Sequence, residues 1–267
     1  MEETWFELAR NDVRLACRDF GGEGPPVLLL HGLAGHAGEW AETASWLTAR
    51  ARVYALDQRG HGRSERRPSD LSRAAHVADV IALVESLGSP RTILIGQSLG
   101  GQTAFLTAAR RRDLVKSLVV AEATAGEPSP ETSAEVRAAL EDWPLPFRSR
   151  QTALDFFGGE GPAARAWVDG LEEAQDGLRP RFDIDVAVSA LEAAETRSYW
   201  NEWASIRCPT LVVRGEHGTL RPEEAGRMSD SPNTRLVEIP GAGHDVHLEN
   251  ATAWRGAIEG FLDAARP

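Results

Sequence analysis

A tight turn built around a serine constrains the fold of this chain more than any other feature of its sequence. The turn is Gly96-Gln97-Ser98-Leu99-Gly100, which follows the apolar run Thr92–Ile95 and precedes a helical pattern. A serine at such a strand–turn–helix junction lies close to its neighbours' backbone, so the positions two before and two after it must lack side chains. The turn projects the serine hydroxyl to the N-terminus of a helix, where negative charge is favoured. The pattern therefore predicts that Ser98 is a nucleophile.

Short apolar runs and helical patterns alternate along most of the chain. The first twenty residues alternate in polarity and predict a hairpin of Trp5–Ala9 and Val13–Asp19. The later runs are apolar on both faces, which suits central strands of a covered parallel sheet, and their alternation with helices predicts a doubly wound, mostly parallel α/β sheet. The predicted strands are Pro26–Leu30, Val53–Leu56, Thr92–Ile95, Leu118–Val120, Pro209–Val213 and Arg235–Ile239, and the clearest helices are Ser72–Leu87, Gly101–Arg111 and Thr252–Ala265.

The segment 124–205 breaks this alternation, because it contains no convincing apolar strand run. It predicts a helical cap of short helices and loops, inserted into a core domain of residues 1–123 and 206–267. The aromatic residues of this segment either fill the core of a small subdomain or line an apolar pocket beneath a lid, and both can hold at once; we favour the lid. These residues are Trp143, Trp167, Trp200, Trp203, Phe147, Phe156, Phe157 and Phe182.

Charge and composition limit the partners of the chain. The net charge of -11 argues against nucleic acid or an anionic membrane, since both need clustered Lys and Arg. The N-terminal sequence lacks the basic and apolar regions of a signal peptide, and no apolar run approaches the roughly 20 residues that span a bilayer. Cys17 and Cys208 are expected as buried free thiols. These features predict a soluble, cytoplasmic protein that acts on a small-molecule substrate, and they leave its oligomeric state open.

A serine hydroxyl is a poor nucleophile at neutral pH and needs a base. Among the seven histidines, His244 follows the last apolar run, in the sequence Pro240-Gly241-Ala242-Gly243-His244-Asp245. In a doubly wound sheet this places it on a loop at the carboxyl edge, the same edge as the serine turn. The small residues before it would let the loop fold over Ser98. We therefore predict His244 as the base; His247, in a more helical stretch, is the nearest competitor.

Acyl transfer also needs two backbone N–H donors aimed at the developing oxyanion. Leu99, directly after the nucleophile, supplies one of them. Leu33 supplies the other, because it follows His31-Gly32 in a glycine-rich turn after the run Leu28–Leu30. His31 itself is expected to be structural. No metal or organic cofactor is implied, because no Cys/His cluster has ligand spacing and no phosphate-binding loop is present.

Several motifs in this order resemble the α/β-hydrolase superfamily over nearly the whole chain. They are the His31-Gly32 turn, the loop Asp57–Ser64, the serine turn, the insertion and the Gly243-His244 ending. The resemblance implies an α/β-hydrolase fold with a helical cap. It also implies that the Asp57–Ser64 loop is a structural brace, and that the chain supplies nucleophile, acid and histidine in that order.

The acid departs from the family pattern. The resemblance places it three residues beyond Gly215, and that position holds Gly218, which cannot orient an imidazole. Glu122 is the preferred substitute, because it follows the run Leu118–Ala121 and some family members, haloalkane dehalogenases among them, place the acid after this strand. The alternatives are Glu216, the adjacent Asp245, and a dyad or water-assisted arrangement without an acid.

The resemblance implies hydrolysis of a small or medium apolar ester, lactone or related acyl substrate through an acyl-enzyme. A carbon–carbon bond hydrolase, an aminopeptidase or a cofactor-free haloperoxidase of the same fold stays open, because the fold does not select a function. Epoxide hydrolases and haloalkane dehalogenases are disfavoured, because they carry Asp where this chain has Ser98. An alternative of another class is a ligand-binding, receptor-like protein with little turnover, which the vacancy at Gly218 supports.

Overall fold

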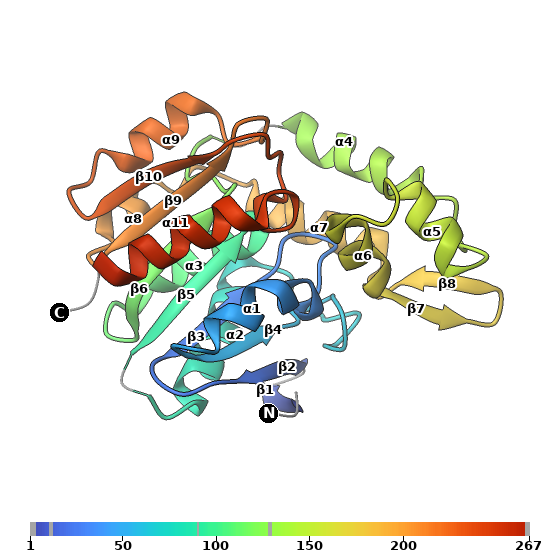
Figure 1. Cartoon of the computed structure of the whole chain (residues 1–267), viewed down its shortest axis with the longest axis horizontal. Helices are drawn as coiled ribbons and strands as arrows, with labels where there is room; N and C mark the ends of the chain where they lie inside the picture. Colours follow the sequence, from blue (N-terminus) through green and yellow to red (C-terminus); the bar gives the residue numbers. More distant parts are fainter. Residues whose placement is uncertain (1–3, 11–12, 90, 128–129, 265–267) are drawn as a thin grey trace.

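An eight-stranded sheet forms the centre of the computed structural model (Figure 1). The structure describes residues 4–10, 13–89, 91–127 and 130–264. The strand order is β1-β2-β4-β3-β5-β6-β9-β10. In the described part of this sheet the pairs β4–β3, β3–β5, β5–β6, β6–β9 and β9–β10 are parallel, whereas the β1–β2 and β2–β4 pairs are antiparallel. This arrangement confirms the predicted doubly wound, mostly parallel α/β sheet.

The elements of the core agree closely with the sequence pattern. Every predicted strand and helix is present; α3 begins at Ser98 rather than Gly101, and Ala265, the predicted end of the last helix, lies outside the described residues. The sequence did not predict η1, α1 or α9, whereas α10 lies in the stretch around His247 that was expected to be more helical. The strands are β1 (Thr4–Arg10), β2 (Val13–Gly21), β3 (Pro26–Leu30), β4 (Arg52–Leu56), β5 (Thr92–Gln97), β6 (Val115–Ala121), β9 (Thr210–Gly215) and β10 (Thr234–Ile239). The helices are η1 (Ala37–Trp40), α1 (Ala41–Leu47), α2 (Arg73–Ser86), α3 (Ser98–Arg110), α8 (Trp200–Ser205), α9 (Pro222–Ser229), α10 (Val246–Glu249) and α11 (Ala251–Ala264).

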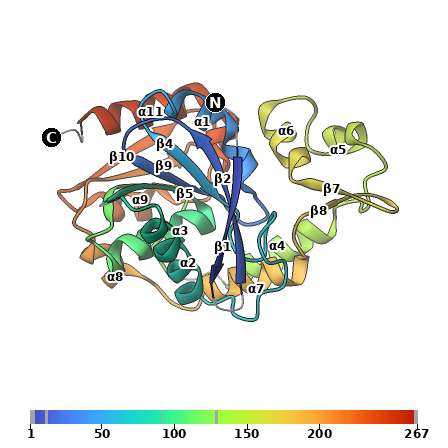
Figure 2. The same cartoon turned by 90° about the horizontal axis from the view of Figure 1, so that it is seen from below.

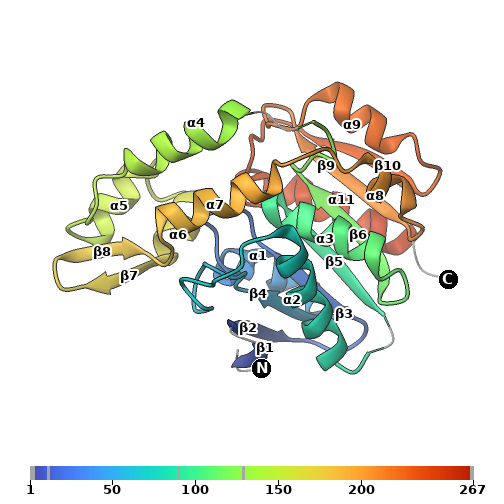
Figure 3. The ribbon, with the colours of Figure 1, turned by 180° about the vertical axis from the view of Figure 1, so that it is seen from behind.

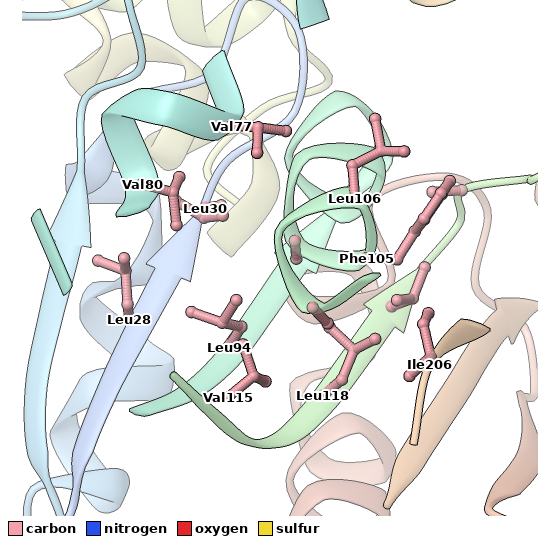
Figure 4. Close-up of a cluster of buried hydrophobic side chains, with 14 of the residues drawn as sticks. Leu28, Leu30, Val77, Val80, Leu94, Phe105, Leu106, Val115, Leu118 and Ile206 are labelled. Atoms are coloured by element: carbon pink, nitrogen blue, oxygen red, sulfur yellow. The ribbon is translucent and has the colours of Figure 1, made fainter. Parts of the chain in front are cut away.

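Helices cover both faces of the sheet, which explains why its central strands are apolar throughout. Helices α1 and α11 lie on one face, and α2, α3 and α8 lie on the other (Figures 1 and 3). Leu28 and Leu30 of β3 pack in the same buried cluster as Phe105 of α3 (Figure 4). Leu29, between them, packs in the opposite cluster with Trp254 of α11. Each such buried leucine contributes roughly 1.5–3 kcal/mol of transfer free energy.

Two glycines of the serine turn make backbone contacts that no larger residue allows. Ser98 itself has a φ of 49°. A Cβ atom on Gly100 would lie 2.3 Å from the carbonyl oxygen of Leu30, and a Cβ on Gly96 would lie 2.3 Å from the carbonyl oxygen of Gly100. Backbone atoms inside a sheet cannot move aside as a flexible side chain can. The close approach of α3 to β3 therefore depends on glycine at position 100, and the tight turn from β5 into α3 depends on glycine at position 96.

We expect Gly100→Ala to lower the free energy of unfolding by about 3 kcal/mol, because the added methyl group overpacks a rigid site. The matched control is Gly256→Ala in the exposed part of α11, where an added Cβ meets no atom within 4 Å. This control should stabilise the protein by roughly 0.5–1 kcal/mol, since alanine favours helix over glycine. Urea denaturation followed by circular dichroism measures both changes. Equal effects of the two substitutions would contradict the close contact between Gly100 and the backbone of Leu30.

The insertion between β6 and β9 contains helices and one short hairpin. The sequence predicted helices and loops only, because β7 and β8 carry no apolar run. Figure 2 shows α5, α6 and the hairpin beside the core, whereas α8, inside the predicted 124–205 segment, lies with the core and packs against α3. The elements are α4 (Pro130–Glu141), α5 (Arg150–Phe156), α6 (Pro162–Asp169), β7 (Leu171–Ala174), β8 (Gly177–Pro180), α7 (Ile184–Ala194) and α8.

Most aromatic residues of the insertion fill packed cores. Trp143 contacts the rings of Phe147, Phe157, Trp167 and Phe182. Trp200 and Trp203 pack instead with the core around α3. The interpretation that these aromatic residues fill a packed core therefore describes most of them.

The two cysteines are free thiols, as predicted; Cys17 is buried, whereas Cys208 is partly exposed. Among the described residues, no helix combines the length and apolar character that crossing a bilayer requires.

Candidate active site

One pocket between the core and the insertion brings all five predicted site residues together. The pocket has a volume of about 450 Å³, and Ser98, Leu99, Leu33, Glu122 and His244 all line it. Ser98 and Leu99 begin α3 directly after β5, and the other three follow the ends of β3, β6 and β10. The carboxyl ends of parallel strands meet at one edge of a sheet, so residues far apart in the sequence converge there.

The serine turn presents a partly exposed hydroxyl and a free backbone donor. Ser98 is the first residue of α3, and the backbone N–H of Leu99 lies in the first helical turn, where no preceding turn supplies an acceptor. Both residues line the pocket. The turn therefore places the predicted nucleophile next to an N–H that can bind negative charge.

The second predicted donor, Leu33, lies on a turn that a buried histidine holds. Ala34, the next residue, has a φ of 62°, and its N–H donates to Nε2 of His61 at 3.2 Å. The other ring nitrogen, Nδ1, lies 3.1 Å from the carbonyl oxygen of Arg59. Burial, reinforced by the nearby His31, lowers the pKa of His61 to about 3, so the ring is neutral and Nε2 is an acceptor. His61 thus fixes the turn that carries Leu33.

His31 is buried and has both ring nitrogens engaged. Nδ1 lies 2.7 Å from the carbonyl oxygen of Gly32, and Nε2 accepts from the backbone N–H of Gln58 at 3.0 Å. These contacts agree with a structural role.

The Asp57–Ser64 loop is bound into the core in the way that the resemblance implies. The Asp57 carboxylate accepts from the N–H of Ala37 at 2.6 Å and from the N–H of Arg63 at 2.8 Å. The Ser64 hydroxyl donates to the carbonyl oxygen of Asp57 and accepts from the N–H of Ala16 at 2.9 Å. The loop therefore connects β2, β4 and η1 and does not contribute to the pocket lining.

Glu122 holds a buried carboxylate at the end of β6. Its side chain is 0% exposed. Its oxygens accept from the backbone N–H groups of Gly215 at 2.7 Å, Thr219 at 2.6 Å and Leu220 at 3.1 Å. Glu122 has a φ of 49°, a conformation that side chains other than glycine adopt at a cost in energy. The backbone is thus bent to aim this carboxylate at the loop after β9.

The Glu122 carboxylate occupies the space that a side chain at position 218 would fill. A Cβ atom built on Gly218 would lie 2.2 Å from Oε1 of Glu122. The absence of a side chain at this position is therefore what makes room for Glu122. A carboxylate at this point beside the loop after β9 can therefore come from either position 122 or position 218.

His244 contacts this carboxylate through one ring nitrogen. Nδ1 lies 3.2 Å from Oε2 of Glu122 and 2.9 Å from Oγ1 of Thr219, and Oγ1 of Thr219 is itself 3.2 Å from Oε2 of Glu122. Nδ1 is thus the protonated nitrogen, and Nε2 is left for the pocket. On the other side, Nε2 of Gln97 donates to the carbonyl oxygen of His244 at 3.0 Å.

Thr219 and Gln97 were not predicted from the sequence. Gln97 lies inside the serine turn, and Thr219 directly follows the vacant Gly218. Their positions next to predicted features were therefore a signal, although the chemistry of a threonine or a glutamine does not by itself mark a catalytic role.

The other candidate acids have different partners. The Glu216 carboxylate accepts from the N–H of Gly241 at 2.8 Å and is not among the residues that line the pocket. Asp245 lines the pocket, but its Oδ1 contacts Nε2 of Gln97 at 3.4 Å. Of the predicted acids, the structure brings Glu122 to the imidazole.

Burial and pairing act in opposite directions on the pKa values of this pair. Burial raises the pKa of Glu122, but hydrogen bonds from His244 and from the backbone of Gly215 and Leu220 outweigh it, so the pKa falls below its usual value. Burial lowers the pKa of His244, but the hydrogen bond to Glu122 and the charge of Asp245 outweigh it, so this pKa rises. The pair therefore favours a charged carboxylate beside an imidazolium.

The raised pKa of His244 predicts the pH dependence of catalysis. We predict that His244 acts as a general base, which must be neutral, so kcat/KM should fall as the pH drops through this raised pKa, at a higher pH than the value of about 6.5 for free histidine would give. In Glu122→Gln this acid limb should move to lower pH, because the hydrogen-bonded carboxylate is lost. Initial rates measured from acidic to alkaline pH give this shift. If the wild-type protein and Glu122→Gln lose activity at the same acidic pH, Glu122 does not raise the pKa of His244.

Aliphatic side chains form most of the apolar wall. They are Leu33, Leu99, Val136, Leu140 and Leu191. Within the described part of the chain, Trp167 is the one aromatic residue of the insertion that lines the pocket. The idea that the aromatic face lines the pocket therefore holds for this residue alone.

Comparison with known proteins agrees with this architecture. A family model described as "alpha/beta hydrolase fold" matches residues 25–251. A 2-(acetamidomethylene)succinate hydrolase of Mesorhizobium japonicum is 28% identical over 257 residues, covering 91% of this chain and 90% of that protein. A pimeloyl-[acyl-carrier protein] methyl ester esterase of Chromobacterium violaceum is 33% identical, covering 91% of this chain and 96% of that protein.

Solved structures agree as well. The enol-lactonase from Burkholderia xenovorans LB400 matches with a TM-score of 0.80 and 26% identity, covering 96% of this chain and 99% of that one. The family match spans most of the chain and the fold is shared in full. This chain therefore belongs to the α/β-hydrolase fold family and is a hydrolase.

Proposed function

We propose that this hydrolase cleaves esters, lactones or related acyl compounds of small to medium size and apolar character, through an acyl-enzyme on Ser98. The observation that carries the proposal is the Glu122 carboxylate, 3.2 Å from Nδ1 of His244, in the space that Gly218 leaves open. A carboxylate at Nδ1 fixes the tautomer of the imidazole and stabilises its charged form. A protein that only binds a ligand has no need of such a base.

In the proposed reaction, Oγ of Ser98 attacks the substrate carbonyl while Nε2 of His244 takes its proton. The oxyanion accepts hydrogen bonds from the N–H groups of Leu33 and Leu99. The imidazolium, paired with Glu122, returns the proton to the leaving oxygen. Water then attacks the acyl-enzyme with His244 as the base, which releases the acid and restores the serine.

The pocket and the relatives support this substrate class. A volume of about 450 Å³ with mostly aliphatic walls falls within the usual range for small-molecule sites. The names of two similar proteins describe an ester and a lactone as substrates. A small-molecule partner fits these features, and the cytoplasmic location stays a prediction.

A panel of 4-nitrophenyl esters from acetate to laurate, together with a fluorophosphonate probe, tests the proposal. We expect hydrolysis that is fastest for short and medium acyl chains, and stoichiometric labelling of the protein. Failure of both reactions would instead favour the receptor-like alternative.

A further inference from the structure

Among the described residues that line the pocket, carboxylates outnumber arginine and lysine side chains. In addition to Glu122, the lining residues include Glu127, Glu195 and Asp245. Arg197 is the one arginine or lysine among the described lining residues. A negatively charged substrate would therefore depend on Arg197 for a cationic partner in this wall.

The charge of Arg197 is already paired. Its Nη2 and Nη1 lie 2.5 Å and 3.2 Å from the two carboxylate oxygens of Glu202, and its guanidinium lies over the ring of Tyr199, 4.2 Å from the centroid. Its side chain is 54% exposed, so the ion pair lies at the rim and faces water. A substrate carboxylate inside the pocket would have to compete with Glu202 for this group.

Glu195 has no such cationic partner among the described contacts. It follows α7, faces the pocket and is half-buried, and one carboxylate oxygen accepts from Oγ of Ser133 at 3.2 Å. Burial raises its pKa, and hydrogen bonds from Ser133 and Thr132 oppose that rise only in part. The wall between α4 and α7 thus presents an uncompensated acid to whatever enters.

A second carboxylate next to Glu195 would be disfavoured twice. It would lose its hydration in a mostly apolar space without gaining a cation, and it would be repelled by a like charge where solvent screening is weak. An uncharged acyl chain suffers neither penalty.

We propose that this pocket takes acyl compounds whose enclosed part is uncharged and selects against those that bring a carboxylate into it, with Glu195 as the residue that sets this selection. The inference rests on the proposed function, since it describes the substrate of the Ser98 site.

A matched pair of esters tests the selection. Methyl hexanoate and monomethyl adipate have equally long acyl chains and the same leaving group, and differ by a terminal carboxylate. Acid release is followed at pH 8, where glutamates are ionised. We expect kcat/KM to favour methyl hexanoate by about 100-fold or more, and Glu195→Gln to reduce this preference about tenfold, the effect of one like charge in a poorly screened site.

Glu192→Gln is the matched control. Glu192 lies on α7, just before Glu195, is exposed and is not among the pocket residues. Its substitution therefore removes the same charge without changing the wall. The preference should stay at its wild-type value in this variant. Equal hydrolysis of the two esters by the wild-type protein would overturn the proposal, as would equal effects of the two glutamine substitutions.

Binding to Ser98→Ala gives a second readout that needs no turnover. Calorimetry should detect methyl hexanoate at concentrations where monomethyl adipate shows no binding, and equal affinities would overturn the selection. If the wild-type protein hydrolyses neither ester and resists the fluorophosphonate, the proposed function fails, while these affinities still decide the selectivity of the pocket.

Discussion

Replacing Ser98 with alanine is expected to lower kcat for ester hydrolysis by about 10⁵-fold or more, because the acyl-enzyme cannot form and only the oxyanion donors remain. The fold should be unaffected. Ser98 has a φ of 49°, and alanine meets the same backbone strain as serine. Initial rates, with fluorophosphonate labelling followed by intact-protein mass spectrometry, measure the loss.

Ser45→Ala is the control for this experiment. Ser45 is an exposed residue of α1 whose hydroxyl donates to the carbonyl oxygen of Glu42, far from the pocket lining. This variant should keep wild-type rates and labelling. Labelling that persists in Ser98→Ala would show that another residue is the nucleophile.

The second large effect is expected for Glu122→Gln, with a decrease in kcat of about 10³–10⁴-fold, because the imidazole loses the group that fixes its tautomer and stabilises its charge. The carboxamide also presents an NH₂ group to the backbone donors of the loop after β9, so one contact becomes unfavourable. Glu216→Gln is the control; its carboxylate binds the N–H of Gly241, so its rate should stay close to wild type. A large loss in the control and a small one in Glu122→Gln would reverse the assignment.

Because side chains at positions 122 and 218 would occupy the same space, moving the acid from one position to the other tests its assignment more strictly. Gly218→Asp alone should destabilise the protein, because its Cβ would lie 2.2 Å from the Glu122 carboxylate. Combined with Glu122→Gly, which removes that carboxylate and suits a positive φ, the same aspartate has room to reach His244. We expect the double variant to exceed Glu122→Gly in kcat/KM by about tenfold, a coupling typical of residues in contact. If the double variant is no more active than Glu122→Gly, a carboxylate at position 218 does not replace that of Glu122 beside His244.

The sequence predicted the sheet well because its strands are covered on both faces. Residues such as Leu28, Leu29 and Leu30 are all buried, so the run is apolar throughout and is easy to recognise. The serine turn was equally clear, since its glycines are required by close backbone contacts, of Gly96 with α3 and of Gly100 with β3. Helices α1 and α9 were missed because they are short and their burial depends on neighbours distant in the sequence.

The acid shows where sequence reasoning stops. The vacancy at Gly218 was visible in the sequence, and it pointed to Glu122. That the carboxylate reaches His244 depends on a positive φ at Glu122 and on three backbone donors from the loop after β9, which no local pattern reveals. Thr219, in contact with both groups, emerged only from the folded chain. The aromatic residues of the insertion were less informative, because their composition fits a pocket wall and a packed core equally well. The pocket wall was favoured, whereas most of these residues pack in cores.

The position of the acid has a consequence for recombination between related genes. In this chain the proposed nucleophile, acid and both oxyanion donors precede the insertion, and only His244 follows it. A relative with its acid after β9 carries that group in the second part of the chain. A crossover within the insertion would therefore give one hybrid with two carboxylates for a single slot and a reciprocal hybrid with none. A functional hybrid formed by a single crossover in the insertion is thus expected only between genes that place the acid after the same strand.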